Sequence, residues 1–130
     1  MRGWIGVDLD GTLAHYDGWQ GEQHIGEPVP AMAARVRKWL ADGLDVRIFT
    51  ARVAKDEFMR ADLSLPAGIP EPMGRSEVRK VIDEWTLKHF GQILPVTCRK
   101  DYGMVELWDD RAVRVRLNTG EPCCGDCEVA

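Results

Sequence analysis

The chain alternates short apolar runs of strand length with segments in which apolar residues recur at helical spacing. The first run, residues 4–9, leads into the sequence Asp8-Leu9-Asp10-Gly11-Thr12. Further strands are predicted at 44–50, 93–98, 104–108 and 113–117. Strands that alternate with helices form a parallel sheet with helices on both faces. The pattern therefore predicts an α/β chain with a mainly parallel central sheet.

Three helices are predicted between these strands. The first begins at Pro30 and ends near Gly43, which suits the left-handed position after a helix. A weaker helix is predicted over about 53–63, before a loop rich in proline and glycine. The third ends near Gly91 and carries the apolar stripe Val78, Val81, Ile82, Trp85, His89 and Phe90.

Length and composition limit the class of protein. A chain of 130 residues with 45% hydrophobic content can form one core without disulfides. We expect a single domain over 1–118, with a flap at about 13–28 and a cysteine-containing tail at 119–130. The net charge of -4 argues against broad attraction to nucleic acid or anionic lipid. No apolar stretch approaches the roughly 20 residues of a membrane helix, so we expect a cytoplasmic protein without membrane contact.

The cysteines do not form a disulfide framework. Cys98 stands alone, whereas Cys123, Cys124 and Cys127 lie together near the end of the chain. Reduced thiols are expected. The tail resembles half of a zinc knuckle, but four ligands are usual at a structural zinc site, so a mobile tail is the other interpretation.

Polar residues follow the carboxyl ends of the predicted strands, which is where ligands bind in parallel sheets. Residues two apart on an extended backbone project to the same side, so Asp8 and Asp10 are expected to face one point. Gly11 allows a sharp turn and leaves backbone amides for an anion. The other strand ends contribute Thr50, Arg99 with Lys100, and Asp109 with Asp110.

These residue types predict a site for a metal-bridged phosphoryl group. Close carboxylates repel each other unless a cation holds them, and Asp109 or Asp110 would complete an oxygen-rich site suited to Mg²⁺. Thr50 can donate a hydrogen bond to a phosphoryl oxygen, and Lys100 can supply positive charge from the opposite side.

In this order, the residues resemble the four motifs of the haloacid dehalogenase-like (HAD) hydrolase superfamily over about residues 4–117. The resemblance implies a three-layer Rossmann-like fold and magnesium-dependent phosphatase activity through an aspartyl-phosphate. Asp8 would be the nucleophile and Asp10 the general acid and base. Thr50, Lys100 and Gly11 would bind the phosphoryl group. Magnesium would be held by the Asp8 side chain, the Asp10 backbone carbonyl and Asp109, with Asp110 behind Asp109 or sharing its role.

The substrate is less constrained by the sequence. Arg52 is placed to reach a second phosphate or a carboxylate, and Trp19, His24 and Tyr16 lie on the flap near a leaving group. The segments in which this superfamily carries caps are short here, so a minimal or absent cap is expected. An open site admits bulky phosphoesters, or a partner subunit of a homo-oligomer provides the lid.

Three functional alternatives stay open. We favour a small-molecule phosphoester as substrate. The sequence Asp109-Asp110-Arg111 also resembles phosphatase domains of polynucleotide kinase-phosphatases, which makes a nucleic-acid 3′-phosphate an alternative that the net charge disfavours. The third alternative is a signalling receiver domain, which accepts a phosphoryl group without hydrolysing it rapidly. In that family, however, the phosphorylated Asp comes from a middle strand.

Overall fold

The structure, a computed structural model, describes residues 3–55 and 76–123. Its centre is a four-stranded sheet in the order β3-β2-β1-β4, with every neighbouring pair parallel. The strands are β1 (Trp4–Asp8), β2 (Asp45–Phe49), β3 (Val96–Thr97) and β4 (Met104–Trp108). The prediction of an α/β fold with a parallel sheet is confirmed.

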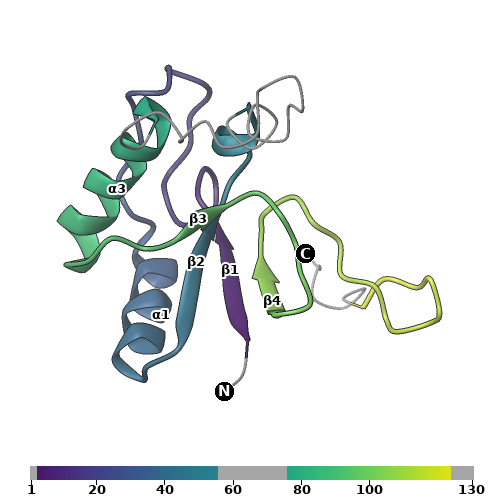
Figure 1. Cartoon of the computed structure of the whole chain (residues 1–130). Coiled ribbons are helices and arrows are strands. Elements are labelled where there is room, and N and C mark those ends of the chain that lie inside the picture. The colour runs from purple at the N-terminus through teal and green to yellow at the C-terminus, as the bar shows by residue number, and fades with distance from the viewer. Residues whose placement is uncertain (1–2, 56–75, 124–130) are drawn as a thin grey trace, which may run out of the picture.

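Two α-helices, α1 (Pro30–Ala41) and α3 (Glu77–Phe90), lie on the same side of this sheet (Figure 1). Alternate residues of β1 and β2 point toward them, because successive side chains of a strand face opposite sides. The core is formed by Ile5, Val7, Val46 and Ile48 of the sheet with Met32, Val36, Val78, Ile82 and Trp85 of the helices. The described helices therefore form one layer against one face.

The helix ends follow the predicted signals. Pro30 is the first residue of α1, and Gly43, just after the helix, has a positive φ of 79°. Gly91 ends α3 in the left-handed conformation, and the Ser76 side chain caps its start by accepting from the Arg79 amide. Most of the helix predicted over 53–63 lies outside the described residues, which show a 3₁₀ turn, η1 (Ala51–Val53), before it.

The buried face of α3 differs from the predicted stripe. Arg79, Asp83 and Thr86 are buried, whereas Val81, His89 and Phe90 are only half-buried. The Arg79 guanidinium donates to the Val96 carbonyl at 2.9 Å, and the Thr86 hydroxyl accepts from the Leu94 amide at 3.4 Å. These polar side chains satisfy backbone groups of the segment around β3. The periodicity of apolar residues does not show that backbone groups need these hydrogen bonds. The prediction that the apolar stripe is the buried face of α3 is therefore partly wrong.

The last two predicted strands need correction. Residues 93–98 contribute only Val96–Thr97 to the sheet, because Pro95 has no amide to donate and Ile93 is exposed. Residues 113–117 do not join the sheet as a fifth strand. The chain instead turns back on itself, with an isolated bridge between Val115 and Pro122, and stands away from β4 (Figure 1). Backbone groups of this segment form hydrogen bonds with one another, as between the Arg116 amide and the Glu121 carbonyl. The alternation of apolar and charged residues over 113–117 therefore does not mark a strand with one buried face.

Among the described residues, no helix is long and apolar enough to cross a membrane. Cys98 and Cys123 are free thiols. Cys124 and Cys127, on which the two interpretations of the tail depend, lie outside the described residues.

Substitutions in the core and in the segment that stands away from the sheet should have different effects on stability. Ile82 is 0% exposed and Leu117 is 86% exposed. We expect Ile82→Ala to lower the free energy of unfolding by about 2–5 kcal/mol, because it leaves a cavity. Leu117→Ala should change it by less than about 0.5 kcal/mol. Urea denaturation followed by circular dichroism measures both, and a comparable loss in Leu117→Ala would contradict its exposed placement.

Candidate active site

A cavity of about 740 Å³ opens at the carboxyl ends of β1, β2 and β4. Seven of the predicted site residues line it: Asp8, Asp10, Trp19, Thr50, Arg52, Asp109 and Asp110. Tyr16 of the flap also lines it, whereas Gly11, His24 and Lys100 do not. The parallel pairing explains the convergence, because it brings the carboxyl ends of neighbouring strands to the same edge.

Asp8, Asp109 and Asp110 form a compact acidic cluster. One carboxylate oxygen from each lies within 4.8 Å of the others. Burial, a hydrogen bond between Asp8 and Asp110, and the negative charges of Asp109 and Asp110 together raise the pKa of Asp8 to about 7. Carboxylates that repel one another at this distance are a suitable donor set for a hard divalent cation, which relieves the repulsion.

Thr12 connects the first strand end with the fourth. Its hydroxyl lies 3.3 Å from the Asp8 carboxylate and 3.0 Å from that of Asp110, and it accepts from the Asp110 amide at 3.0 Å. Sequence reasoning assigned no role to Thr12, although it belongs to the Asp-x-Asp-Gly-Thr motif. A hydroxyl can both donate and accept, so Thr12 can orient the two acidic groups together.

Gly11 contributes space and backbone freedom to the site. Its φ is 91°, and a Cβ there would lie 2.8 Å from Oδ2 of Asp110. Its amide donates to the Ala14 carbonyl at 2.8 Å. The structure therefore gives this amide an internal partner, and the phosphate-binding role of Gly11 stays a prediction.

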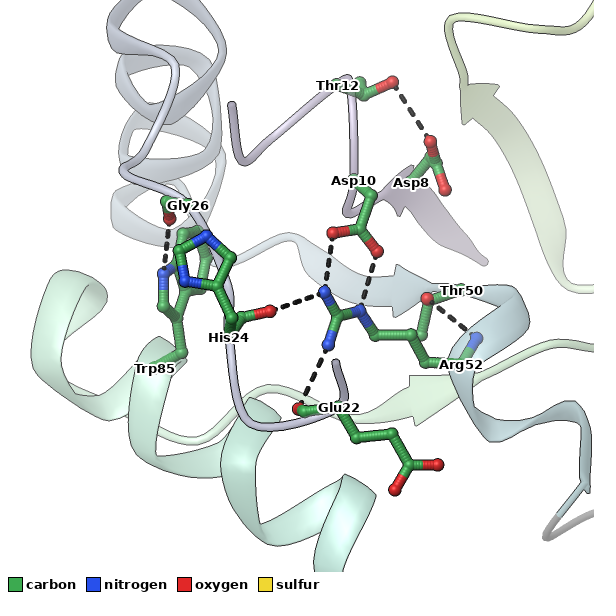
Figure 2. A network of polar contacts seen from close by, with 9 residues as sticks. All are labelled: Asp8, Asp10, Thr12, Glu22, His24, Gly26, Thr50, Arg52 and Trp85. Atoms are coloured by element: carbon green, nitrogen blue, oxygen red, sulfur yellow. Dashed lines mark hydrogen bonds and ion pairs between the residues drawn. The ribbon is translucent and has the colours of Figure 1, made fainter. Parts of the chain in front are cut away.

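Asp10 faces a different partner from Asp8. Both of its oxygens accept from Arg52, at 2.7 Å from Nε and 2.8 Å from Nη2, and the Arg52 side chain is 5% exposed (Figure 2). The expectation that Asp8 and Asp10 face one point therefore needs correction. The two carboxylates share the cavity, but Arg52 directs that of Asp10 away from the acidic cluster.

Two residues of the 13–28 segment, which was expected to form the flap, contact Arg52 through their backbone. Arg52 donates to the carbonyls of Glu22 and His24, and the His24 ring is not among the cavity-lining groups. Trp19 lies with its ring centroid 4.8 Å from the Arg52 guanidinium carbon. A contact of His24 with substrate through its imidazole stays a prediction.

The positive charge near the cavity also differs from expectation. Lys100 is exposed and does not line the cavity, whereas Arg111 does. Arg111 follows the acidic pair directly, and its amide donates to the Asp109 side chain at 2.8 Å. The sequence analysis assigned Arg111 no role in the site. Because Arg111 directly follows Asp109 and Asp110, its position in the sequence could have indicated a positively charged side chain at this edge of the sheet.

Thr50 occupies the place predicted for it at the end of β2. It is 2% exposed, lines the cavity and accepts from the Arg52 amide at 3.1 Å. Its own amide donates to the Thr97 carbonyl of β3 at 2.9 Å. Thr50 is therefore held rigidly, while its hydroxyl hydrogen can be donated.

Comparisons of the chain with protein-family models, with curated proteins and with solved structures found no match.

Replacement of Gly11 tests the contact with Asp110. Gly11→Ala should lower the free energy of unfolding more than Gly18→Ala, by about 1 kcal/mol, because the new methyl group displaces the carboxylate that Thr12 holds. Gly18 is a matched control: its φ is also positive, at 111°, but a Cβ there meets nothing within 4 Å. Chemical denaturation gives both values, and equal losses would show that Asp110 moves without cost.

Proposed function

We propose that this protein is a magnesium-dependent phosphomonoester hydrolase of the HAD-like type that acts through an aspartyl-phosphate on Asp8. The observation that supports it most is the meeting of Asp8 with Asp109 and Asp110 at the carboxyl edge of a parallel sheet. The proposal includes a three-layer Rossmann-like fold with a minimal or absent cap, and a cytoplasmic location.

The charge of the cavity supports a cation. Its acidic lining residues are Asp8, Asp10, Glu22, Asp109 and Asp110, and its basic ones are Arg52 and Arg111. Arg52 is already paired with Asp10. A phosphate ester is itself negative, so this cavity would repel it without further positive charge. Mg²⁺ held by Asp8, Asp109 and Asp110, with the Asp10 carbonyl, would neutralise phosphoryl oxygens and align the ester.

The chemical steps fall to two carboxylates. An Asp8 oxygen forms a bond to phosphorus while the bond from phosphorus to the leaving oxygen breaks. Asp10 in its protonated form gives a proton to the leaving oxygen. The carboxylate that results, in the form that Arg52 holds at both oxygens, then takes a proton from the water that attacks the aspartyl-phosphate. The products are an alcohol and inorganic phosphate, and Asp8 is regenerated. Both carboxylates line the same cavity, as these steps require.

The neighbouring polar groups would bind the phosphoryl oxygens. The Thr50 hydroxyl can donate one hydrogen bond from a rigid position. Arg111 lines the cavity and can supply the positive charge that the sequence assigned to Lys100. Lys100 could contribute only if its exposed side chain turned toward the cavity.

The cavity favours a small-molecule phosphoester. Its lining includes Tyr16 and Trp19, which are 47% and 58% exposed and whose aromatic side chains can contact a leaving group. A nucleic-acid 3′-phosphate remains the alternative, and the chain's net charge of -4 weighs against it. A homo-oligomer could supply a lid from a partner subunit.

Removal of the nucleophile should abolish turnover. Asp8→Asn is expected to lower kcat/KM for an aryl phosphate in Mg²⁺ by a factor of at least about 1,000, because an amide does not form the phosphoryl intermediate. Asp42→Asn is the control, since Asp42 lies at the far end of α1 and is exposed. Metal-dependent turnover by Asp8→Asn at the wild-type rate would exclude the mechanism. A phosphorylated Asp8 that persists for minutes would instead indicate a signalling domain.

Metal binding should stabilise the fold. At a Mg²⁺ concentration of 100 Kd, we expect the free energy of unfolding to rise by about 2.7 kcal/mol. Asp109→Asn should remove most of this gain, whereas Asp101→Asn, on the loop before β4, should retain it. Thermal unfolding with Mg²⁺ or with KCl of equal ionic strength measures the effect. An equal response to both salts would indicate screening instead of a site.

A further inference from the structure

We propose that Arg52 is a positioning residue that fastens the flap to the catalytic edge and holds the Asp10 carboxylate in place for proton transfer. The inference rests on the proposed function and assigns Arg52 a role other than substrate binding. In this arrangement, the position of the flap and the acid-base step depend on one side chain.

The hydrogen bonds of Arg52 define this role. Nε and Nη2 donate to the two oxygens of Asp10 at 2.7 and 2.8 Å. Nη1 donates to the Glu22 carbonyl at 3.2 Å, and Nη2 also donates to the His24 carbonyl at 2.8 Å (Figure 2). All three guanidinium nitrogens are therefore engaged within the protein. These four bonds use four of the five N–H groups of the guanidinium, which leaves little donor capacity for a substrate anion.

The local backbone aims Arg52 at these partners. The Thr50 hydroxyl accepts from the Arg52 amide, which fixes the first turn after β2. From there the side chain crosses the carboxyl edge of the sheet to Asp10, which follows β1. Its planar guanidinium matches a carboxylate with two parallel hydrogen bonds, a geometry that the lysine ammonium cannot reproduce.

The Arg52 guanidinium also contacts Trp19, which lines the cavity. The Trp19 ring centroid lies 4.8 Å from its central carbon, a distance at which a cation attracts an aromatic face. Arg52 thus holds three parts of the flap: the Trp19 ring and the carbonyls of Glu22 and His24. A second anchor lies further along the chain, where the Trp85 indole donates to the Gly26 carbonyl at 2.9 Å.

A comparison of Arg52 with Trp85, the two residues that anchor the flap, distinguishes positioning of Asp10 from simple attachment of the loop. Loss of either anchor loosens the flap, but only loss of Arg52 also frees the Asp10 carboxylate. Proton donation matters most when the leaving oxygen is strongly basic, as in an alkyl phosphate. A nitrophenolate leaves with little help. The ratio of the two rates therefore reports on Asp10 and is insensitive to general loosening.

The experiment compares Arg52→Gln, Arg52→Lys and Trp85→Phe with the wild type in Mg²⁺. We expect Arg52→Gln to lower kcat for an alkyl phosphate at least about tenfold more than kcat for p-nitrophenyl phosphate. Arg52→Lys should show an intermediate ratio, because it keeps the charge but not the paired hydrogen bonds. Trp85→Phe should change both rates by the same factor. Urea midpoints identify any variant that is unfolded, and Arg52→Lys then provides the comparison.

Hydrogen exchange of the amides of residues 13–28 gives a second readout that needs no activity. Faster exchange is expected in Arg52→Gln near residues 22–24, and in Trp85→Phe near residue 26. Equal losses on both substrates, a change in KM alone, or unchanged exchange near 22–24 would overturn the inference. If the wild type hydrolyses no phosphoester, the proposed function fails, and the exchange data still decide whether Arg52 fastens the flap.

Discussion

Parallel pairing of β1 with β2 on one side and β4 on the other is the constraint on which the rest of the structure depends. Val7 pairs with Trp108, so Asp8 and Asp109 follow at the same edge of the sheet. Asp8 pairs with Phe49, which places Thr50 and Arg52 beside Asp10. Segments about 100 residues apart in the chain thereby supply one cavity. The buried apolar residues of β1 and β2 hold this register, because a shift of one residue would turn them away from α1 and α3.

Two carboxylates of one short motif have opposite surroundings. Asp8 lies among other acids, and burial together with their charges raises its pKa to about 7. Asp10 lies against a nearly buried guanidinium. A raised pKa favours the protonated carboxyl, so the proposed attack by ionised Asp8 depends on a cation at the acidic cluster. In the proposed reaction, the carboxylate near the metal ligands attacks phosphorus, and the carboxylate held by Arg52 transfers the proton.

Much of the fold could be predicted because its signals are local. Strand-length apolar runs located β1, β2 and β4, and proline and glycine marked the ends of α1 and α3. The errors arose where hydrogen bonds with another segment of the chain decided whether a residue is buried or joins a strand. Arg79 and Thr86 of α3 are buried because the backbone near β3 needs their hydrogen bonds. Val113, Val115 and Leu117 alternate like a strand, but the turn at 116–121 pairs the chain with itself.

The sequence by itself determined the α/β class and the parallel sheet. It also determined that the polar residues after the strands gather at one cavity: Asp8, Asp10, Thr50, Asp109 and Asp110. Strand periodicity and the rule that ligands bind at carboxyl ends suffice for this. Only the tertiary structure decided the orientation of side chains within that cavity. It turned Asp10 toward Arg52, placed Arg111 in the lining instead of Lys100, and joined Asp8 to Asp110 through Thr12. The physical reason is that hydrogen bonds and ion pairs between distant segments depend on distances of a few ångströms, which spacing along the chain does not specify.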